Sequence, residues 1–118
     1  MGLPWFRVDT NLPTHDKIIE LVGVRGGKAA AFVYLASLAY SVGNGTDGLI
    51  RRAALPFVHG TTTEARILAE HRLWDVVEGG WRIRNFGTRQ MVAAEAQAAA
   101  DEISEARKRA ANKRWGNA

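Results

Sequence analysis

Residues 105–118 contain a dense group of basic side chains, the kind with which proteins contact phosphate. The segment contains only one acidic residue, Glu105, and its basic residues are Arg107, Lys108, Arg109, Lys113 and Arg114. It carries the whole formal net charge of +4, because the other residues balance to zero. Two interpretations stay open: a phosphate-binding tail, or a solubilising helix end whose cations favour the negative pole of the helix dipole.

Further arginines that could bind nucleic acid lie within the body of the sequence. Arg66 could form a bidentate pair with guanine, or an ordinary i,i+4 ion pair with Glu70. The pair Arg82 and Arg84 could reach phosphate or the minor groove, or could simply be exposed to solvent. Arg51 and Arg52 form a second close pair.

Catalytic and metal-binding patterns are weak by comparison. The three histidines, His15, His59 and His71, are scattered and form no HExxH motif. Residues 26–29 (GGKA) lack the spacing of a phosphate loop and the Ser or Thr that follows its lysine. The sequence has no cysteine, which excludes disulfides, thiolate chemistry and sulfur-ligated zinc. We therefore expect a non-enzymatic protein with no cofactor, no metal and no catalytic residue.

The first half of the chain predicts two helices that would position these groups. Pro4 to Pro13 indicates an extended lead-in that places Trp5 and Phe6 on the core. Thr14 can cap a helix over Asp16 to Val22, whose buried side would be Ile18, Ile19, Leu21 and Val22. A second helix over Lys28 to Val42 is apolar nearly all round, with Ala31, Phe32, Leu35, Leu38 and Ala39, and should be the central element. The glycine-rich turn at 43–48 ends it.

The second half predicts shorter elements in a definite order. Leu49 to Arg51 can form a strand, and Arg52 to Val58 a short helix that ends at Gly60. Thr61 and Glu64 form a capping box for a helix that runs to about Arg72, with Ala65, Leu68, Ala69 and Leu73 facing the core. Residues 73–77 and 81–86 flank Glu78-Gly79-Gly80 as a β-hairpin, with Arg82 and Arg84 on the face opposite Trp81 and Ile83.

The last predicted element is one long helix over Arg89 to Trp115, rich in Ala, Glu, Gln and Arg. Its weak apolar stripe could pack on the chain's own core or form a homodimer with a second copy; the stripe consists of Met91, Ala94, Ala98, Ile103 and Ala106. It has too little Leu and Ile for a coiled coil.

A short helix, a tight turn and a capped helix followed by a hairpin indicate a winged helix-turn-helix. The fold class expected is mainly α with a small β-hairpin. Residues 1–87 would form the winged helix-turn-helix domain, and residues 88–118 the long helix with its basic tail. In such a motif Arg51 and Arg52 are placed to meet backbone phosphate.

The chain resembles the N-terminal winged-helix domain of phage replication-initiation proteins, the replisome-organiser, DnaD-like and lambda O-like initiators of actinobacterial phages and prophages. The resemblance covers roughly residues 5–115. The residues that carry it are Trp5, Asp9, His15 to Ile18, Asp47-Gly48, Leu73-Trp74 and Gly79 to Phe86. The resemblance implies that the helix from Thr62 to Arg72 lies in the major groove of duplex DNA. The candidates that face solvent, and hence base edges, are Thr62, Thr63, Arg66 and Glu70.

We therefore expect a duplex DNA-binding protein, sequence-specific or general, that acts in phage replication initiation or transcription regulation. The alternative is a winged-helix interaction module that binds a host or replisome protein without DNA; the neutral body and the cation-poor helix favour it. The longest apolar stretch, Ala29 to Tyr40, is too short to span a bilayer, and the first residues lack a signal-peptide layout. The expected location is the cytoplasm of a bacterial host cell, with no membrane contact.

Overall fold

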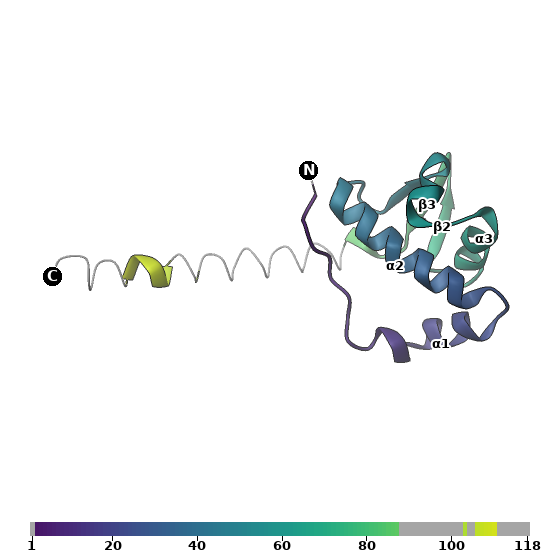
Figure 1. Ribbon diagram of the computed structural model, residues 1–118, viewed down its shortest axis with the longest axis horizontal. Coiled ribbons are helices and arrows are strands. Elements are labelled where there is room, and N and C mark those ends of the chain that lie inside the picture. Colours follow the sequence, from purple (N-terminus) through teal and green to yellow (C-terminus); the bar gives the residue numbers. More distant parts are fainter. Residues whose placement is uncertain (1, 88–102, 104–105, 111–118) are drawn as a thin grey trace.

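The computed structural model describes residues 2–87, 103 and 106–110 (Figure 1). Two short 3-10 helices, three α-helices and three strands occur in residues 2–87. In chain order they are η1 (Leu12–Thr14), α1 (Asp16–Gly23), α2 (Gly27–Asn44), β1 (Leu49–Arg51), η2 (Arg52–Val58), α3 (Thr62–Glu70), β2 (Trp74–Val77) and β3 (Gly80–Ile83). The expected fold class, mainly helical with a small β-hairpin, is confirmed at that level.

The three strands form one antiparallel sheet in the order β1-β3-β2. The predicted hairpin of β2 and β3 is present, and its turn contains Gly79 with a φ of +81°. The strand β1 pairs with the other edge of β3, so Ile50, Trp81 and Val76 lie side by side on one face. The same register places Arg82 on the opposite face, as the alternation of the sequence predicts.

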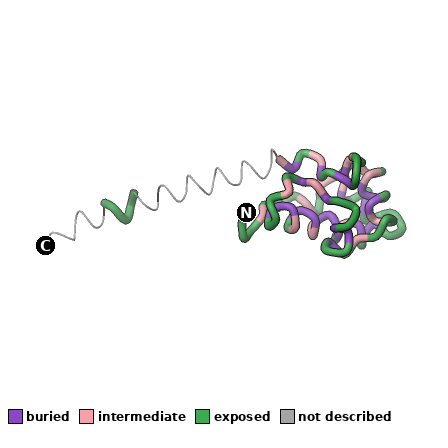
Figure 2. The backbone as a smooth tube through the Cα atoms, turned by 90° about the horizontal axis from the view of Figure 1, so that it is seen from above, coloured by how far each residue is buried: buried purple, intermediate pink, exposed green. Residues whose placement is uncertain are grey.

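The helix α2 is the central element, as expected from its composition, and contacts α1, α3 and η2 (Figures 1 and 2). Its buried side includes Val33, Ser37 and Leu38, whereas Phe32 is 58% exposed and Ala39 is exposed. Because α2 is apolar nearly all round, periodicity alone could not select the side that faces the core.

The short helix α1 buries fewer side chains than expected. Ile18 and Leu21 are buried against the core, while Ile19 is 54% and Val22 36% exposed. A two-turn helix presents only one stripe to its neighbour, and residues three apart share that stripe. The prediction that all four would be buried was therefore wrong for two of them. In the lead-in before α1, Phe6 packs against the core as expected, but Trp5 is exposed.

Local capping explains where the helices begin and end. The prediction of Thr14 as the cap of α1 was wrong: His15 is the N-cap, and its Nδ1 accepts a hydrogen bond from the backbone N–H of Lys17 at 3.2 Å. The capping box at the start of α3 is present as predicted. That helix ends at Glu70, two residues short of the predicted end, because Arg72 has a φ of +59° and leaves the helical conformation.

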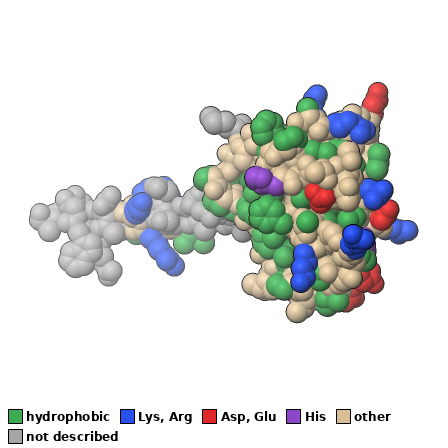
Figure 3. All heavy atoms as spheres, turned by 45° about the vertical axis from the view of Figure 1, so that its right-hand side comes forward, with side chains coloured by type: hydrophobic (Ala, Val, Ile, Leu, Met, Phe, Trp, Pro, Cys, Tyr) green, Lys and Arg blue, Asp and Glu red, His purple; other side chains and the backbone are tan. Residues whose placement is uncertain are grey.

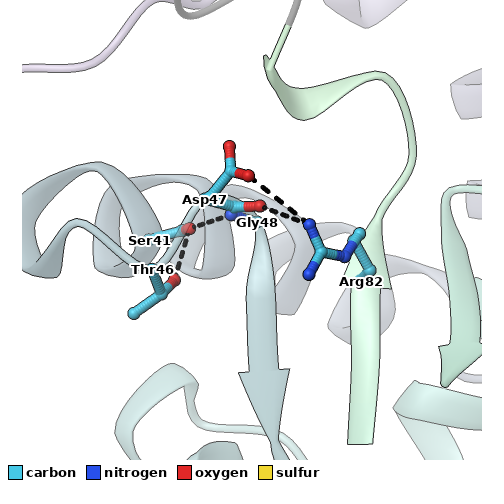
Figure 4. Close-up of polar contacts among 5 residues, drawn as sticks. All are labelled: Ser41, Thr46, Asp47, Gly48 and Arg82. Atoms are coloured by element: carbon cyan, nitrogen blue, oxygen red, sulfur yellow. Dashed lines mark hydrogen bonds and ion pairs between the residues drawn. The ribbon is translucent and has the colours of Figure 1, made fainter. Parts of the chain in front are cut away.

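The turn between α2 and β1 is fixed by two hydrogen bonds of the Ser41 hydroxyl (Figure 4). The Ser41 hydroxyl oxygen accepts from the Gly48 backbone N–H at 2.6 Å and shares a second hydrogen bond of 2.6 Å with the Thr46 hydroxyl. Gly48 has a φ of +84°, and a Cβ there would lie 2.9 Å from the Phe86 side chain. Since the Gly48 carbonyl accepts from the Ile83 N–H, this turn sets the position of β3.

Most of the predicted long helix lies outside the described residues. The structure describes Ile103 and residues 106–110 of it, all helical and exposed. The proposed domain boundary at residue 88, and Met91, Ala94 and Ala98 of the dimerisation stripe, fall outside the described part. The described core residues all lie between Ile18 and Phe86.

Candidate nucleic-acid interface

The helix α3 presents a polar side to solvent. Ala65 and Leu68 are completely buried and Ile67 is nearly so, which anchors the helix on the core. The predicted candidates Thr62, Thr63 and Arg66 are all exposed. Because the capping box satisfies backbone groups at the first turn, that turn is held as a regular helical end with its side chains available.

The ion pair between Arg66 and Glu70, which was the alternative role predicted for Arg66, is present. Its Nε lies 3.9 Å from Oε1 of Glu70, and the two side chains are 71% and 64% exposed. An exposed i,i+4 pair of this length contributes only a few tenths of a kcal/mol. The guanidinium of Arg66 therefore remains available to a stronger anionic partner.

Arg25, which was not predicted as a contact residue, lies beside this surface. The segment Val24-Arg25-Gly26 between α1 and α2 borders a shallow hollow whose other side is formed by α3, including Thr63 and Arg66. Gly26 has a φ of +78°, and a Cβ there would lie 3.3 Å from Ile67 of α3. The signal that could have identified Arg25 is the glycine pair after it, which allows this close approach to α3.

Arg51 and Arg52 lie at the turn end of the hairpin. The backbone N–H of Arg52 donates to the Gly79 carbonyl at 3.0 Å, and Arg51 pairs with Gly80 across β1 and β3. Their side chains have different neighbours. The Arg52 guanidinium lies 5.3 Å from the centre of the Trp81 ring, and Arg51 borders a hollow beside Tyr40. Both are exposed, so both remain candidates for phosphate contact.

Arg84 is engaged by an acidic partner within the fold. Its Nη2 donates to Oδ1 of Asp75 at 2.6 Å and its Nε donates to the same oxygen at 3.2 Å. These hydrogen bonds to Arg84 hold the pKa of Asp75 below its ordinary value of 3.8 and raise the pKa of Arg84 above its own. The charge of Arg84 is thereby largely compensated, which weakens its candidacy as a phosphate contact.

Arg82 also has a carboxylate neighbour, although a more distant one. Its Nη1 lies 3.5 Å from Oδ2 of Asp47 and 3.3 Å from the Asp47 carbonyl oxygen (Figure 4). Arg82 pairs with Leu49 in the sheet, two residues farther from the hairpin turn than Gly80. The structure thus groups Thr62, Thr63, Arg66 and Arg25 at α3, and places Arg82 and Arg84 toward the open end of the hairpin.

The basic tail is described only in part. Arg107, Lys108 and Arg109 are exposed on the helical segment 106–110. Lys113 and Arg114 lie outside the described residues. Figure 3 shows basic and acidic side chains interspersed over one face of the folded body. On that face, neither basic nor acidic side chains form a large continuous patch.

His59, His71, Trp74 and Trp81 occupy structural positions. His59, with a φ of +62°, ends η2 and lies 5.9 Å from the Phe32 ring, and His71 ends α3. Trp74 and Trp81 are buried, and their ring centres lie 5.7 Å apart, so both belong to the packed core. Within the described residues, no three His, Asp or Glu side chains gather as a metal site would require.

No helix in the described part of the chain has the length and apolar character needed to cross a membrane. Comparisons of the sequence with protein-family models and with curated proteins, and of the structure with solved structures, gave no match.

Proposed function

We propose that this protein is a winged-helix protein that binds duplex DNA through α3. The topology supports the fold assignment: β1, the helices η2 and α3, then the β2–β3 hairpin, with β1 paired to the far edge of β3. In this arrangement η2 and α3 act as the helix-turn-helix, and the hairpin acts as the wing.

The observation that carries the proposal is the exposed first half of α3 beside Arg25. Thr62, Thr63 and Arg66 project from a capped helix whose opposite side is fully buried, so the helix can enter a groove without exposing its core contacts. Arg66 would contact a guanine edge or a phosphate, and Arg25 would contact the adjacent backbone. Arg51 and Arg52 would add phosphate contacts at the hairpin turn.

The affinity would be strongly electrostatic. The interface at α3 supplies two arginines, and the tail residues Arg107, Lys108, Arg109, Lys113 and Arg114 supply additional charge. The resemblance to phage replication-initiation domains supports a role in replication initiation or transcription regulation of phage or prophage DNA.

Fluorescence anisotropy of the full chain on a random-sequence duplex, across a salt series, tests this proposal. The variant Arg25→Gln/Arg66→Gln should weaken binding roughly tenfold at fixed salt and reduce the salt slope by up to about 1.8. The matched control Arg7→Gln/Lys17→Gln removes the same charge from another part of the surface and should have a smaller effect. Equal losses would show that α3 is not the interface, and absence of binding at low salt would overturn the DNA proposal.

A protein-binding role is the second candidate, and the exposed aromatic surface on α2 and η2 favours it. Phe57 is 71% and Phe32 58% exposed, and Phe57 stacks on Tyr40 at 6.2 Å. Large exposed aromatic groups are enriched at protein interfaces. If the chain does not bind DNA, a pull-down with the wild-type chain and with Phe32→Ser/Phe57→Ser would show whether a host or replisome protein binds at this surface.

A further inference from the structure

A cavity of about 210 Å³ lies between the segment that precedes α1 and the body of the fold. Its apolar lining comes from several elements that are distant in sequence: Ile18, Tyr34, Leu38, Leu73, Ile83 and Phe86. It is smaller than the 300–1,000 Å³ typical of drug-sized ligand sites. The space therefore suits a compact apolar group, such as one or two fused rings or a branched chain.

Basic side chains border the same cavity. Arg7, Lys17, Arg72 and Arg84 are among its lining residues, and Asp9 is the acidic one. Arg7 pairs with Asp9 at 3.1 Å and Arg84 with Asp75 at 2.6 Å.

Of the lysines and arginines that line the cavity, Lys17 and Arg72 are the two with no ion-paired carboxylate among residues 2–87. The Lys17 ammonium donates to a neutral acceptor, the Arg72 carbonyl oxygen, at 3.2 Å. Within residues 2–87, no carboxylate lies within ion-pair distance of either side chain, although Lys17 contributes a weak charge effect at Asp75. Among the described residues, the edge of an apolar cavity thus carries two positive charges that form no ion pair.

We propose that this cavity binds a small organic anion with an apolar body and one carboxylate. The apolar body would lie against Leu38, Ile83 and Phe86, and the carboxylate would accept hydrogen bonds from Lys17 and Arg72. A charge-assisted hydrogen bond contributes more than a neutral one, so an apolar body that carries a carboxylate should bind here more tightly than the same body with a neutral polar group. This proposal does not depend on DNA binding, because the cavity is separate from the exposed side of α3.

Isothermal titration calorimetry of the full chain without DNA tests the proposal with two matched probes. 1-Naphthoate carries a carboxylate on a two-ring body, and 1-naphthamide is its neutral counterpart of similar shape. The carboxylate should bind at least about tenfold more tightly than the amide, as expected for charge-assisted hydrogen bonds. Equal affinities, or no naphthoate binding at its solubility limit, would overturn the proposal.

Substitutions then assign the site. Lys17→Gln/Arg72→Gln should abolish the preference for naphthoate over naphthamide, while Lys28→Gln/Arg51→Gln, which removes two exposed charges elsewhere, should preserve it. Amide chemical-shift changes in the wild-type chain provide a second readout that needs no substitution. They should centre on residues 7–18, 72–73 and 83–86, and changes centred on the Phe32 and Phe57 surface would place the ligand elsewhere and overturn the assignment.

Discussion

Ser41 is a buried polar side chain whose hydroxyl holds the turn that follows α2. Its oxygen accepts from the Gly48 N–H, and that amide is itself buried. Ser41→Ala should therefore lower the free energy of unfolding by about 1–3 kcal/mol, since a buried donor loses its partner. Urea unfolding measures the loss. Ser37→Ala is the control, because the Ser37 hydroxyl only donates to the Tyr34 carbonyl within its own helix. A cost no larger than that of the control would show that the turn does not depend on Ser41.

The pair of Asp75 and Arg84 predicts a pH dependence of stability. The pKa of Asp75 is lower in the folded state than its ordinary value of 3.8, so the folded chain holds this proton less tightly than the unfolded chain. The stabilisation is present above that value and is lost as the pH falls through the folded pKa. Both side chains are more than a third exposed, so solvent screens the pair and the effect is small.

Asp75→Asn should accordingly reduce stability at pH 7 and have less effect as the pH falls below about 4. Thermal unfolding of the wild type and the variant between pH 7 and pH 2 measures the difference. Glu78→Gln, at the exposed hairpin turn, removes one carboxylate without an ion pair in the described residues and should show no such convergence. A difference between wild type and Asp75→Asn that stays constant with pH would contradict the assigned role.

Among the elements, α3 depends most clearly on a local sequence signal. The Thr61 N–H donates to Glu64 Oε1 at 3.0 Å, and the Thr61 hydroxyl oxygen accepts from the Thr63 N–H at 3.3 Å. Thr61→Ala removes the second contact and should cost about 1 kcal/mol. Hydrogen exchange of the first-turn amides of α3 should speed up in parallel. Thr62→Ala, at an exposed position, is the matched control, and an equal effect of the two changes would mean that the cap contributes nothing.

Elements governed by neighbouring residues could be predicted from the sequence. The capping box, the hairpin around Gly79 and the order of elements from β1 to β3 depend on short-range chemistry. Local signals were insufficient in two places. Thr14 and His15 are adjacent and both can cap a helix, and His15 is the residue that does so. The uniformly apolar α2 has no polar stripe to mark its outer side.

The candidate nucleic-acid interface depends on contacts between elements that are distant in sequence, and sequence patterns do not reveal such contacts. Asp47 lies in the turn before β1, outside the hairpin that carries Arg82, so this pair could not be foreseen, whereas Asp75 lies across the predicted hairpin from Arg82 and beside Arg84. Arg25 reaches the α3 surface only because Gly26 lets one connection approach another helix. In contrast, exposure of Thr62, Thr63 and Arg66 follows from the helical period of α3, and the sequence predicted it.

On the scale of the whole molecule, charge is divided unevenly between the body and the tail. Residues 2–87 mix basic and acidic side chains, several of them paired, whereas residues 105–118 hold five cations and one anion. Long-range attraction to a polyanion depends on net charge, and local recognition depends on side-chain geometry. The tail would therefore govern the strength of DNA binding, and α3 would govern its position.

Neutralising the tail should reduce affinity without changing preference among DNA sequences. Arg107→Gln/Lys108→Gln/Arg109→Gln removes three exposed cations and should lower the slope of log affinity against log salt by up to about 2.7, since each phosphate contact contributes about 0.9. Ala106→Gln/Ala110→Gln changes exposed residues of the same segment without changing its charge and is the control. Anisotropy on several duplexes at five salt concentrations gives both quantities. An unchanged slope would exclude these three cations from phosphate contact, and an altered rank order of duplexes would mean that the tail also reads sequence.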